Sequence, residues 1–102
     1  MSSAQVVESK FRAVEARVSE DTISVDLEDG RTISVPISWY PRIAHGSIEE
    51  REVFVIIGNG TGIHWPVLDE DVSVEGLLMG RPSSESPESF SKWLSKRKYV
   101  SD

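Results

Sequence analysis

The stretch TISVDLEDGRTISVPI, residues 22–37, decides the fold because apolar and polar residues alternate on both sides of an Asp-Gly pair. Alternation with a period of two is typical of β-strands that have one buried face and one wet face. The stretch therefore predicts two antiparallel strands joined by a tight turn. The apolar positions of the two strands are Ile23, Val25, Leu27, Ile33, Val35 and Ile37.

The length of the turn follows from the same pattern. A two-residue loop would place apolar residues opposite polar ones on both faces of the hairpin. A three-residue loop over residues 28–30 instead pairs Val25 with Ile33, which keeps the apolar side chains together. Such a loop predicts that Gly30 is left-handed and forms a bulge.

A third strand is predicted upstream of the hairpin. Val14, Ala16 and Val18 continue the alternation, and residues 19–21 form a polar turn before the next strand. The alternative is a helix that buries Phe11, Val14 and Val18, and we rank it second.

Short helices are predicted after the hairpin. Residues 38–46 form a turn into a helix that tolerates Pro41 in its first turn and ends at Gly46. Ser47 and Glu50 then have the spacing of a capping box, which predicts a second short helical segment.

The second half of the sequence alternates between strand and helix signals. Residues 53–57 are all apolar, which favours a strand buried on both faces, and the glycines that follow turn the chain into a second strand containing Ile63 and Trp65. Residues 73–80 are typical of a helix, with Ser73, Asp69 and Asp71 supplying its cap and first-turn charge.

The chain is expected to be a small α+β domain with an antiparallel sheet built on the N-terminal hairpin, short helices and a C-terminal helix. The predicted boundaries are a domain over residues 1–80, a linker over 81–86, and a helix with its tail over 87–102. Phe90, Trp93 and Leu94 form one apolar stripe on that helix. We expect the stripe to dock on its own domain or on a homodimer mate rather than on another protein.

Composition limits the classes of function. The 102 residues carry a net charge of −6 and no cysteine, so a disulfide framework, a cysteine nucleophile and a cysteine-based zinc site are excluded. The N-terminus lacks the pattern of a signal peptide and no apolar run is long enough to span a membrane, so a cytoplasmic protein is expected. The acidic balance argues against nucleic-acid binding, which needs a basic face for phosphate contacts.

No motif predicts an enzyme, a metal site or a cofactor. The stretch GNGTGIHWP, residues 58–66, departs from the dinucleotide fingerprint because Ile63 stands where the third glycine is needed. His64 with Asp69 or Asp71 could supply metal ligands, but the chain has only two histidines, and strong metal-binding motifs use repeated His or Cys residues. No nucleophile elbow or His/Asp spacing typical of a hydrolase is present.

Two segments that join an aromatic residue to a proline are the candidates for contact with a partner protein: WYPR at residues 39–42 and HWP at residues 64–66. The same residues could instead close the core, which we favour for Trp65. With the apolar stripe of the last helix, the predicted partner-binding residues are Trp39, Tyr40, Arg42, His64, Trp65, Phe90 and Trp93.

The chain resembles the prokaryotic family known as domain of unknown function 2442. The resemblance rests on DGRTISVPISWYPRI, on EERE, and on GIHWPVLDEDVSVEGLLMG, over residues 14–80. It implies a small α+β domain, sometimes fused to a helix-turn-helix, and often encoded beside a small protein in what resembles a toxin–antitoxin pair. It implies no catalytic residues, and one helix after the linker is too little for a helix-turn-helix.

These observations lead to three hypotheses. The preferred one is an antitoxin-like protein-binding module whose partner is a small toxin-like protein, with a homodimer as a further possibility. The second is a dimeric DNA-associated regulator that uses a C-terminal basic cluster on phosphate. The third is a small enzyme or metal protein at His64. The basic cluster consists of Lys92, Lys96, Arg97 and Lys98.

Overall fold

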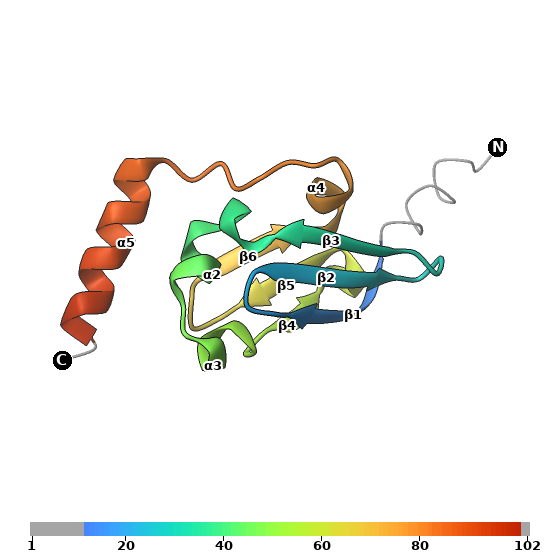
Figure 1. The fold of residues 1–102 in the computed structure, drawn as a ribbon, viewed down its shortest axis with the longest axis horizontal. Helices are drawn as coiled ribbons and strands as arrows, with labels where there is room; N and C mark the ends of the chain where they lie inside the picture. The colour runs from blue at the N-terminus through green and yellow to red at the C-terminus, as the bar shows by residue number, and fades with distance from the viewer. Residues whose placement is uncertain (1–11, 101–102) are drawn as a thin grey trace.

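The computed structural model describes residues 12–100, with side chains described for residues 12–97. This part of the chain forms two antiparallel sheets of three strands each, together with short helices and a longer C-terminal helix (Figure 1). The α+β class is confirmed, although one sheet was expected and two are present. The first sheet contains β1 (Ala13–Val18), β2 (Thr22–Leu27) and β3 (Thr32–Pro36), and the second contains β4 (Val55–Ile57), β5 (Gly62–Trp65) and β6 (Glu70–Ser73).

The β2–β3 hairpin has the register that its apolar pattern predicts. Val25 pairs with Ile33, and Ile23 pairs with Val35. The N–H of Leu27 donates to the carbonyl of Arg31 at 2.8 Å, which closes a three-residue loop. Gly30 has a φ of 97°, so the predicted left-handed glycine is confirmed.

Strand β1 is present where a third strand was predicted, and the alternative helix is wrong over residues 13–18. Phe11, which that helix would have buried, lies outside the described residues. The ladder with β2 contains a bulge between Ala13 and Glu15. The bulge turns Val14 outward to solvent while Ala16 is buried, so the expected shared face of these two residues is wrong.

The short helices between the sheets begin and end at the residues that the sequence indicates. A 3-10 turn, η1 (Ile37–Trp39), comes first, and helix α2 (Pro41–His45) follows it and ends before Gly46. Helix α3 (Ile48–Arg51) comes next. The predicted capping box is confirmed: the Glu50 N–H donates to Ser47 Oγ at 3.1 Å, and the Ser47 N–H donates to Glu50 Oε1 at 2.8 Å.

The second sheet departs from the sequence expectation at both of its edge strands. β4 is shorter than the predicted strand, and Val55 and Ile57 are exposed because one face of this sheet meets solvent. β6 was not predicted. Asp71 lies within this strand, so its expected role in capping the next helix is wrong, and Asp69 instead bonds Arg42 through its carbonyl and carboxylate.

Two local predictions in this half are confirmed. The glycine stretch forms a turn, η2 (Gly58–Gly60), between β4 and β5. Ser73 caps α4 (Val74–Leu78), because its Oγ accepts the Gly76 N–H at 3.1 Å.

The core lies between the two sheets and α2. Trp65 is fully buried, and its indole N–H donates to the carbonyl of Arg51 at 2.8 Å, which satisfies the polar atom of a buried ring. The core interpretation of Trp65 is therefore confirmed. The largest fully buried side chains are Trp65, Ile23, Ile43, Ile63, Leu68, Val25 and Val74.

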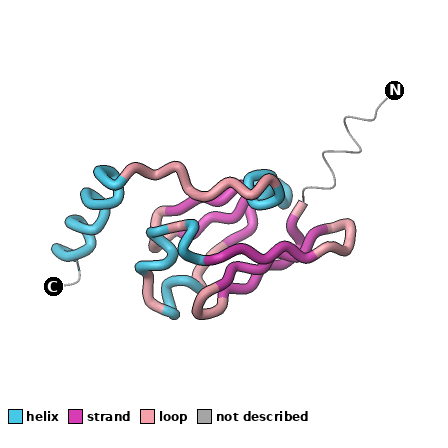
Figure 2. Tube along the Cα trace, turned by 45° about the horizontal axis from the view of Figure 1, so that its top comes forward, coloured by secondary structure: helices cyan, strands magenta, loops and turns pink. Residues whose placement is uncertain are grey.

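Residues 81–86 form an extended segment that runs along the domain and leads to α5 (Pro87–Val100), as Figure 2 shows. Ser86 caps this helix by accepting the Ser89 N–H at 3.1 Å. Helix α5 lies at one end of the domain (Figure 1), and the principal-axis extents of the structure are 55 × 24 × 20 Å. Within residues 12–100 no helix has the length and apolar character to cross a membrane.

Candidate functional site

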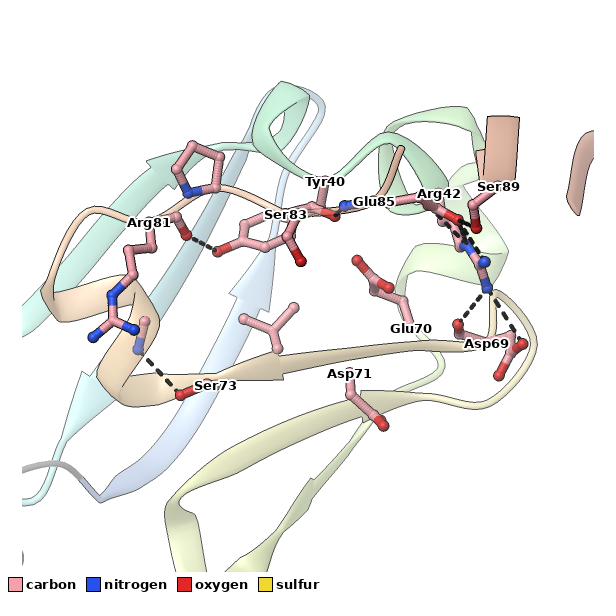
Figure 3. Close-up of a pocket in the computed structure, with 14 residues that line it drawn as sticks. Tyr40, Arg42, Asp69, Glu70, Asp71, Ser73, Arg81, Ser83, Glu85 and Ser89 are labelled. Carbon is pink, nitrogen blue, oxygen red and sulfur yellow. Dashed lines mark hydrogen bonds and ion pairs between the residues drawn. The ribbon is translucent and has the colours of Figure 1, made fainter. Parts of the chain in front are cut away.

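A cavity of about 630 Å³ lies between β6 and the extended segment 81–86. Figure 3 shows that its walls come from parts of the chain that are distant in sequence, including the turn before α2, strand β6 and the start of α5. The residues that line it with ionisable or phenolic groups are Tyr40, Arg42, Asp69, Glu70, Asp71, Arg81 and Glu85.

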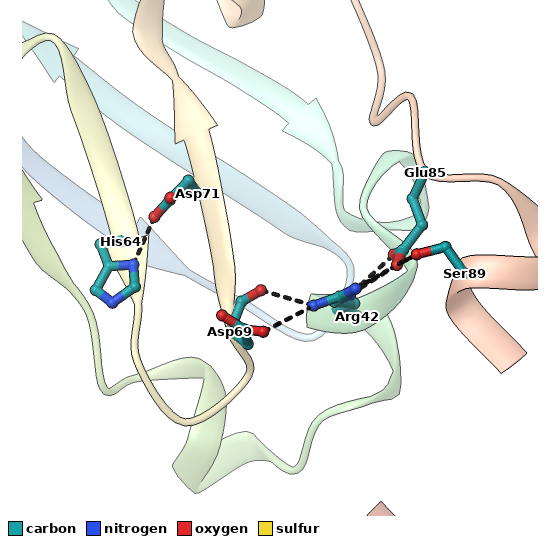
Figure 4. A network of polar contacts seen from close by, with 6 residues as sticks. All are labelled: Arg42, His64, Asp69, Asp71, Glu85 and Ser89. Carbon is teal, nitrogen blue, oxygen red and sulfur yellow. Dashed lines mark hydrogen bonds and ion pairs between the residues drawn. The ribbon is translucent and has the colours of Figure 1, made fainter. Parts of the chain in front are cut away.

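Arg42 bonds residues from two walls of the cavity at one of its ends. Its Nε donates to both carboxylate oxygens of Glu85, at 2.9 and 3.0 Å, and Nη2 donates to Oε2 of the same residue at 2.5 Å. Its Nη1 donates to the carbonyl of Asp69 at 2.9 Å and to the Asp69 carboxylate at 3.3 Å (Figure 4). One guanidinium therefore connects the segment 81–86 to the turn before β6.

The Glu85 carboxylate is fully occupied by these contacts. Besides the Arg42 bonds, it accepts the Ser89 hydroxyl at 2.8 Å. The hydrogen bonds from Arg42 keep the pKa of Glu85 below its usual value, with the Ser89 hydroxyl acting in the same direction. Glu85 is therefore ionised at neutral pH and serves to anchor the segment.

Glu70 is the unusual group of the cavity. Its cross-strand partner is Trp65, and the neighbouring pair on the same face is Ile63 with Val72, so the Glu70 side chain leaves β6 on the core side. Burial raises its pKa to about 7, and the charges of Glu85, Asp71 and Asp69 add to the effect of burial against the opposing charge of Arg42. Its carboxyl group makes no hydrogen bond or ion pair to another described residue.

Tyr40 closes the cavity at its inner wall. The phenol is buried and donates to the carbonyl of Arg81 at 3.3 Å, while the Ser83 N–H donates to the carbonyl of Trp39 at 3.0 Å. Burial raises the pKa of Tyr40, and the Glu70 charge raises it further. These contacts attach the segment 81–86 along its length.

The indole of Trp93 docks α5 on the same chain. Two guanidinium groups lie over the ring, Arg42 at 5.3 Å and Arg97 at 4.8 Å from its centroid, and the ring stacks on Phe90 with 5.7 Å between centroids. His45 meets its edge at 6.0 Å. Contact with its own domain is one of the two arrangements that the apolar stripe predicts.

A charged pair reinforces this docking. Arg97 Nη2 donates to Glu50 Oε1 at 2.8 Å, and this bond lowers the pKa of Glu50 together with the capping-box contacts of Ser47. Of the predicted basic cluster, Arg97 is thus engaged within the chain, whereas Lys92 and Lys96 are exposed on α5. The Lys98 side chain lies outside the described side chains.

His64 lies on the opposite face of the second sheet from Glu70. Its Nδ1 is 2.5 Å from Asp71 Oδ1, directly across the β5–β6 ladder, and its other cross-strand partner is Val55 on β4. Figure 4 shows this pair separated by β6 from the Arg42 network. Among the described residues, no group of three or more His, Cys, Asp or Glu side chains is arranged to hold a metal ion.

The structure brings together some of the predicted residues and separates others. Tyr40 and Arg42 line the cavity, Trp93 on the docked helix contacts Arg42, and Phe90 stacks on Trp93. Trp39 is half-buried against the core, Trp65 is inside it, and His64 is on another surface.

Sequence reasoning missed Glu70 and Glu85. The alternation of Leu68, Glu70 and Val72 was a usable signal for Glu70, because a period of two places it on the apolar face. Glu85 had no such signal, since its partner Arg42 is 43 positions away in the chain.

The comparison with protein-family models matches residues 13–83 to the protein of unknown function family DUF2442. The chain belongs to this family. The resemblance over residues 14–80 is thereby confirmed. A comparison with curated proteins gave no match.

Two solved structures have the same fold. A crystal structure of a protein of unknown function from Rhodospirillum rubrum is 33% identical, with a TM-score of 0.65, and the match covers 72% of this chain and 92% of that one. A solution NMR structure of an uncharacterized protein from Chromobacterium violaceum is 23% identical, with a TM-score of 0.64, and the match covers 94% of this chain and 85% of that one. The second match therefore extends beyond residues 13–83.

Proposed function

We propose that this protein is an antitoxin-like protein-binding module that contacts its partner through the outer face of the second sheet. We define the outer face as the solvent side of strands β4 to β6, which contains Val55, Ile57, His64 and Asp71.

The observation that carries the proposal is the apolar part of this face. Val55 and Ile57 are 47% and 39% exposed, although both lie in a regular strand whose inner side chain, Ile56, packs on the core. Val55 is directly opposite His64, whose side chain is 36% exposed. Apolar side chains adjacent to a polar pair on an open sheet face are typical of a protein contact surface.

Burial directs the proposal to this face rather than to the aromatic residues that the sequence favours. Tyr40, Trp65 and Trp93 are buried within the chain, so their rings offer no free surface in this conformation. Of the predicted residues, His64 is the one that combines exposure with apolar neighbours on the same face.

The partner that fits this surface has an apolar centre and a basic rim. The chain has a net charge of −6, and Asp71 adds an exposed carboxylate to the outer face, so a basic partner would be attracted to it. That this partner is a small toxin-like protein met in a prokaryotic cytoplasm is part of the same proposal, and it rests on the family resemblance of the sequence.

The experiment compares two double variants in affinity capture from the native host, followed by direct binding of the captured protein in purified form. The first variant, Val55→Ser with Ile57→Ser, removes the apolar part of the outer face. The control, Ile48→Ser with Met79→Ser, removes two exposed apolar side chains from helical segments, each 61% exposed. Melting temperatures of both variants establish that they are folded.

We expect the wild type and the control to bind the same protein and the outer-face variant to bind it at least tenfold more weakly. Equal weakening in both variants, or none in the outer-face variant, contradicts the proposal. If the chain captures DNA instead of a protein, and if this binding weakens steeply with added salt, the result would favour the DNA-associated regulator.

A further inference from the structure

We propose that the cavity between β6 and residues 81–86 binds a small organic cation, such as an alkylammonium or alkylguanidinium group, through the Glu70 carboxylate. This site is on the other side of β6 from the outer face, so the inference is independent of the proposed protein contact.

Beside Glu70 the free polar groups of the cavity are acceptors, and the guanidinium of Arg81 lies at the other end of the cavity (Figure 3). Arg42 directs its bonding nitrogens at Glu85 and Asp69, so it has little capacity left for an anion. The Tyr40 hydroxyl donates its proton to the Arg81 carbonyl, which leaves its oxygen lone pairs as acceptors. A ligand that supplies several N–H donors matches this arrangement.

Among the described carboxyl groups that line the cavity, Glu70 is the one without a hydrogen-bond or ion-pair partner. Figure 3 shows its side chain directed into the cavity, between Tyr40 and Arg42, whereas Asp71 points away from it. Around Glu70 lie two further carboxylates, Asp69 and Glu85, and one guanidinium, Arg42, so its surroundings carry an excess of negative charge. A cation would give Glu70 the ion pair that the chain itself does not provide.

The position of Glu70 is unfavourable for an ionised carboxyl group, because the effect of burial exceeds the opposing charge of Arg42. A carboxyl group on the core side of a strand, opposite a buried indole, opposes folding when it is ionised. Groups that are costly to the fold and that point into a cavity are characteristic of binding sites. The size of the cavity, about 630 Å³, is within the range of small-molecule sites.

Binding should depend on pH because the cation requires ionised Glu70. The charged and titratable groups around it are Arg42 on α2, Tyr40 before α2, Asp69 in the turn before β6, Asp71 in β6, and Glu85 on the segment 81–86. With a Glu70 pKa of about 7, the ionised fraction rises roughly tenfold from about pH 6 to about pH 8. Affinity for the cation should rise by the same factor.

The probe is butylguanidinium, and its neutral isostere butylurea tests the need for the charge. Both are titrated into the full chain at constant ionic strength while backbone amide NMR signals are followed. Two variants are compared with the wild type: Glu70→Gln, which removes the charge and keeps the shape, and Glu75→Gln, which removes an exposed carboxylate of α4 outside the cavity.

We expect saturable shifts at cavity residues with butylguanidinium, none with butylurea, at least tenfold weaker binding in Glu70→Gln, and unchanged binding in Glu75→Gln. The pH dependence should disappear in Glu70→Gln. The proposal is overturned if butylguanidinium gives no saturable shifts at millimolar concentration, if butylurea binds equally well, or if Glu70→Gln binds like the wild type.

Discussion

Glu70 lies directly opposite Trp65 in the β5–β6 ladder, so a carboxyl group and a fully buried indole share the core side of one sheet. The opposite side of the same strands holds the pair of His64 and Asp71. The second sheet therefore separates two surfaces of different chemistry. One is the acidic cavity under residues 81–86, and the other is the partly apolar outer face.

The first prediction concerns stability and pH. The folded-state pKa of Glu70 is raised from 4.5 to about 7, so the fold favours the neutral acid. Its contribution to stability is full below the unfolded pKa and declines as pH rises from 4.5 to about 7. Glu70→Gln should therefore be more stable than the wild type at about pH 8, by about 1–2 kcal/mol after allowance for solvent screening, and nearly equal to it at about pH 4.

Urea unfolding at a series of pH values measures this difference. Glu75→Gln serves as the control, and its difference from the wild type should stay nearly constant over the same pH range. A Glu70→Gln variant that is less stable than the wild type at neutral pH would show that the carboxylate has a stabilising partner.

The second prediction concerns the fork of Arg42. Arg42→Lys keeps the positive charge but loses the paired bonds to Glu85, and the Arg42 side chain is only 16% exposed. We expect a loss of about 1–2 kcal/mol and faster amide exchange in residues 81–86 and α5. Hydrogen exchange with mass spectrometry measures both effects by segment.

The matched control is Arg31→Lys. Arg31 bonds Asp29 at 2.9 Å in the exposed hairpin loop, with 52% of its side chain exposed, so its replacement should change stability by less than about 0.5 kcal/mol. Equal effects of the two substitutions would mean that Arg42 does not anchor the segment.

The third prediction concerns the docking of α5. Trp93→Ala removes a buried ring that contacts the guanidiniums of Arg42 and Arg97, and it should lower stability by about 2–3 kcal/mol. Lys92→Ala, on the exposed side of the same helix, should change the stability by less than about 0.5 kcal/mol.

Thermal unfolding at several protein concentrations also tests whether α5 docks within one chain. A melting temperature of the wild type that rises with concentration would indicate exchange of α5 between two copies.

The fourth prediction concerns the hairpin turn. Gly30 has a φ of 97° and open space around its Cα, so Gly30→Ala meets backbone strain without a steric clash and should cost about 1 kcal/mol. Gly76→Ala in α4 should instead stabilise the protein by up to about 1 kcal/mol, because its added Cβ would be in ordinary contact with Ser73. Chemical denaturation of both variants gives the comparison, and a stabilising Gly30→Ala would rule out the strain.

Several local features can be predicted from the sequence because residues close in the chain determine them. The capping box needs only Ser47 and Glu50, and the hairpin register needs only the spacing of apolar residues around Gly30. The bulge that exposes Val14 could not be predicted from the sequence, since it depends on how β1 pairs with β2. The exposure of Val55 could not be predicted either, because an apolar run has the same pattern in a buried strand and in an edge strand.

The sequence by itself determined the α+β class, the β2–β3 register and the caps of the short helices, because these depend on backbone preferences and on contacts between residues close in the chain. Only the tertiary structure decided the candidate sites. Arg42 meets Glu85 and Asp69 because α2, the segment 81–86 and the turn before β6 pack together. The alternation of Leu68, Glu70 and Val72 is a signal for the side of β6 that Glu70 occupies, although β6 was not predicted. The cavity on that side exists only because a distant segment covers it.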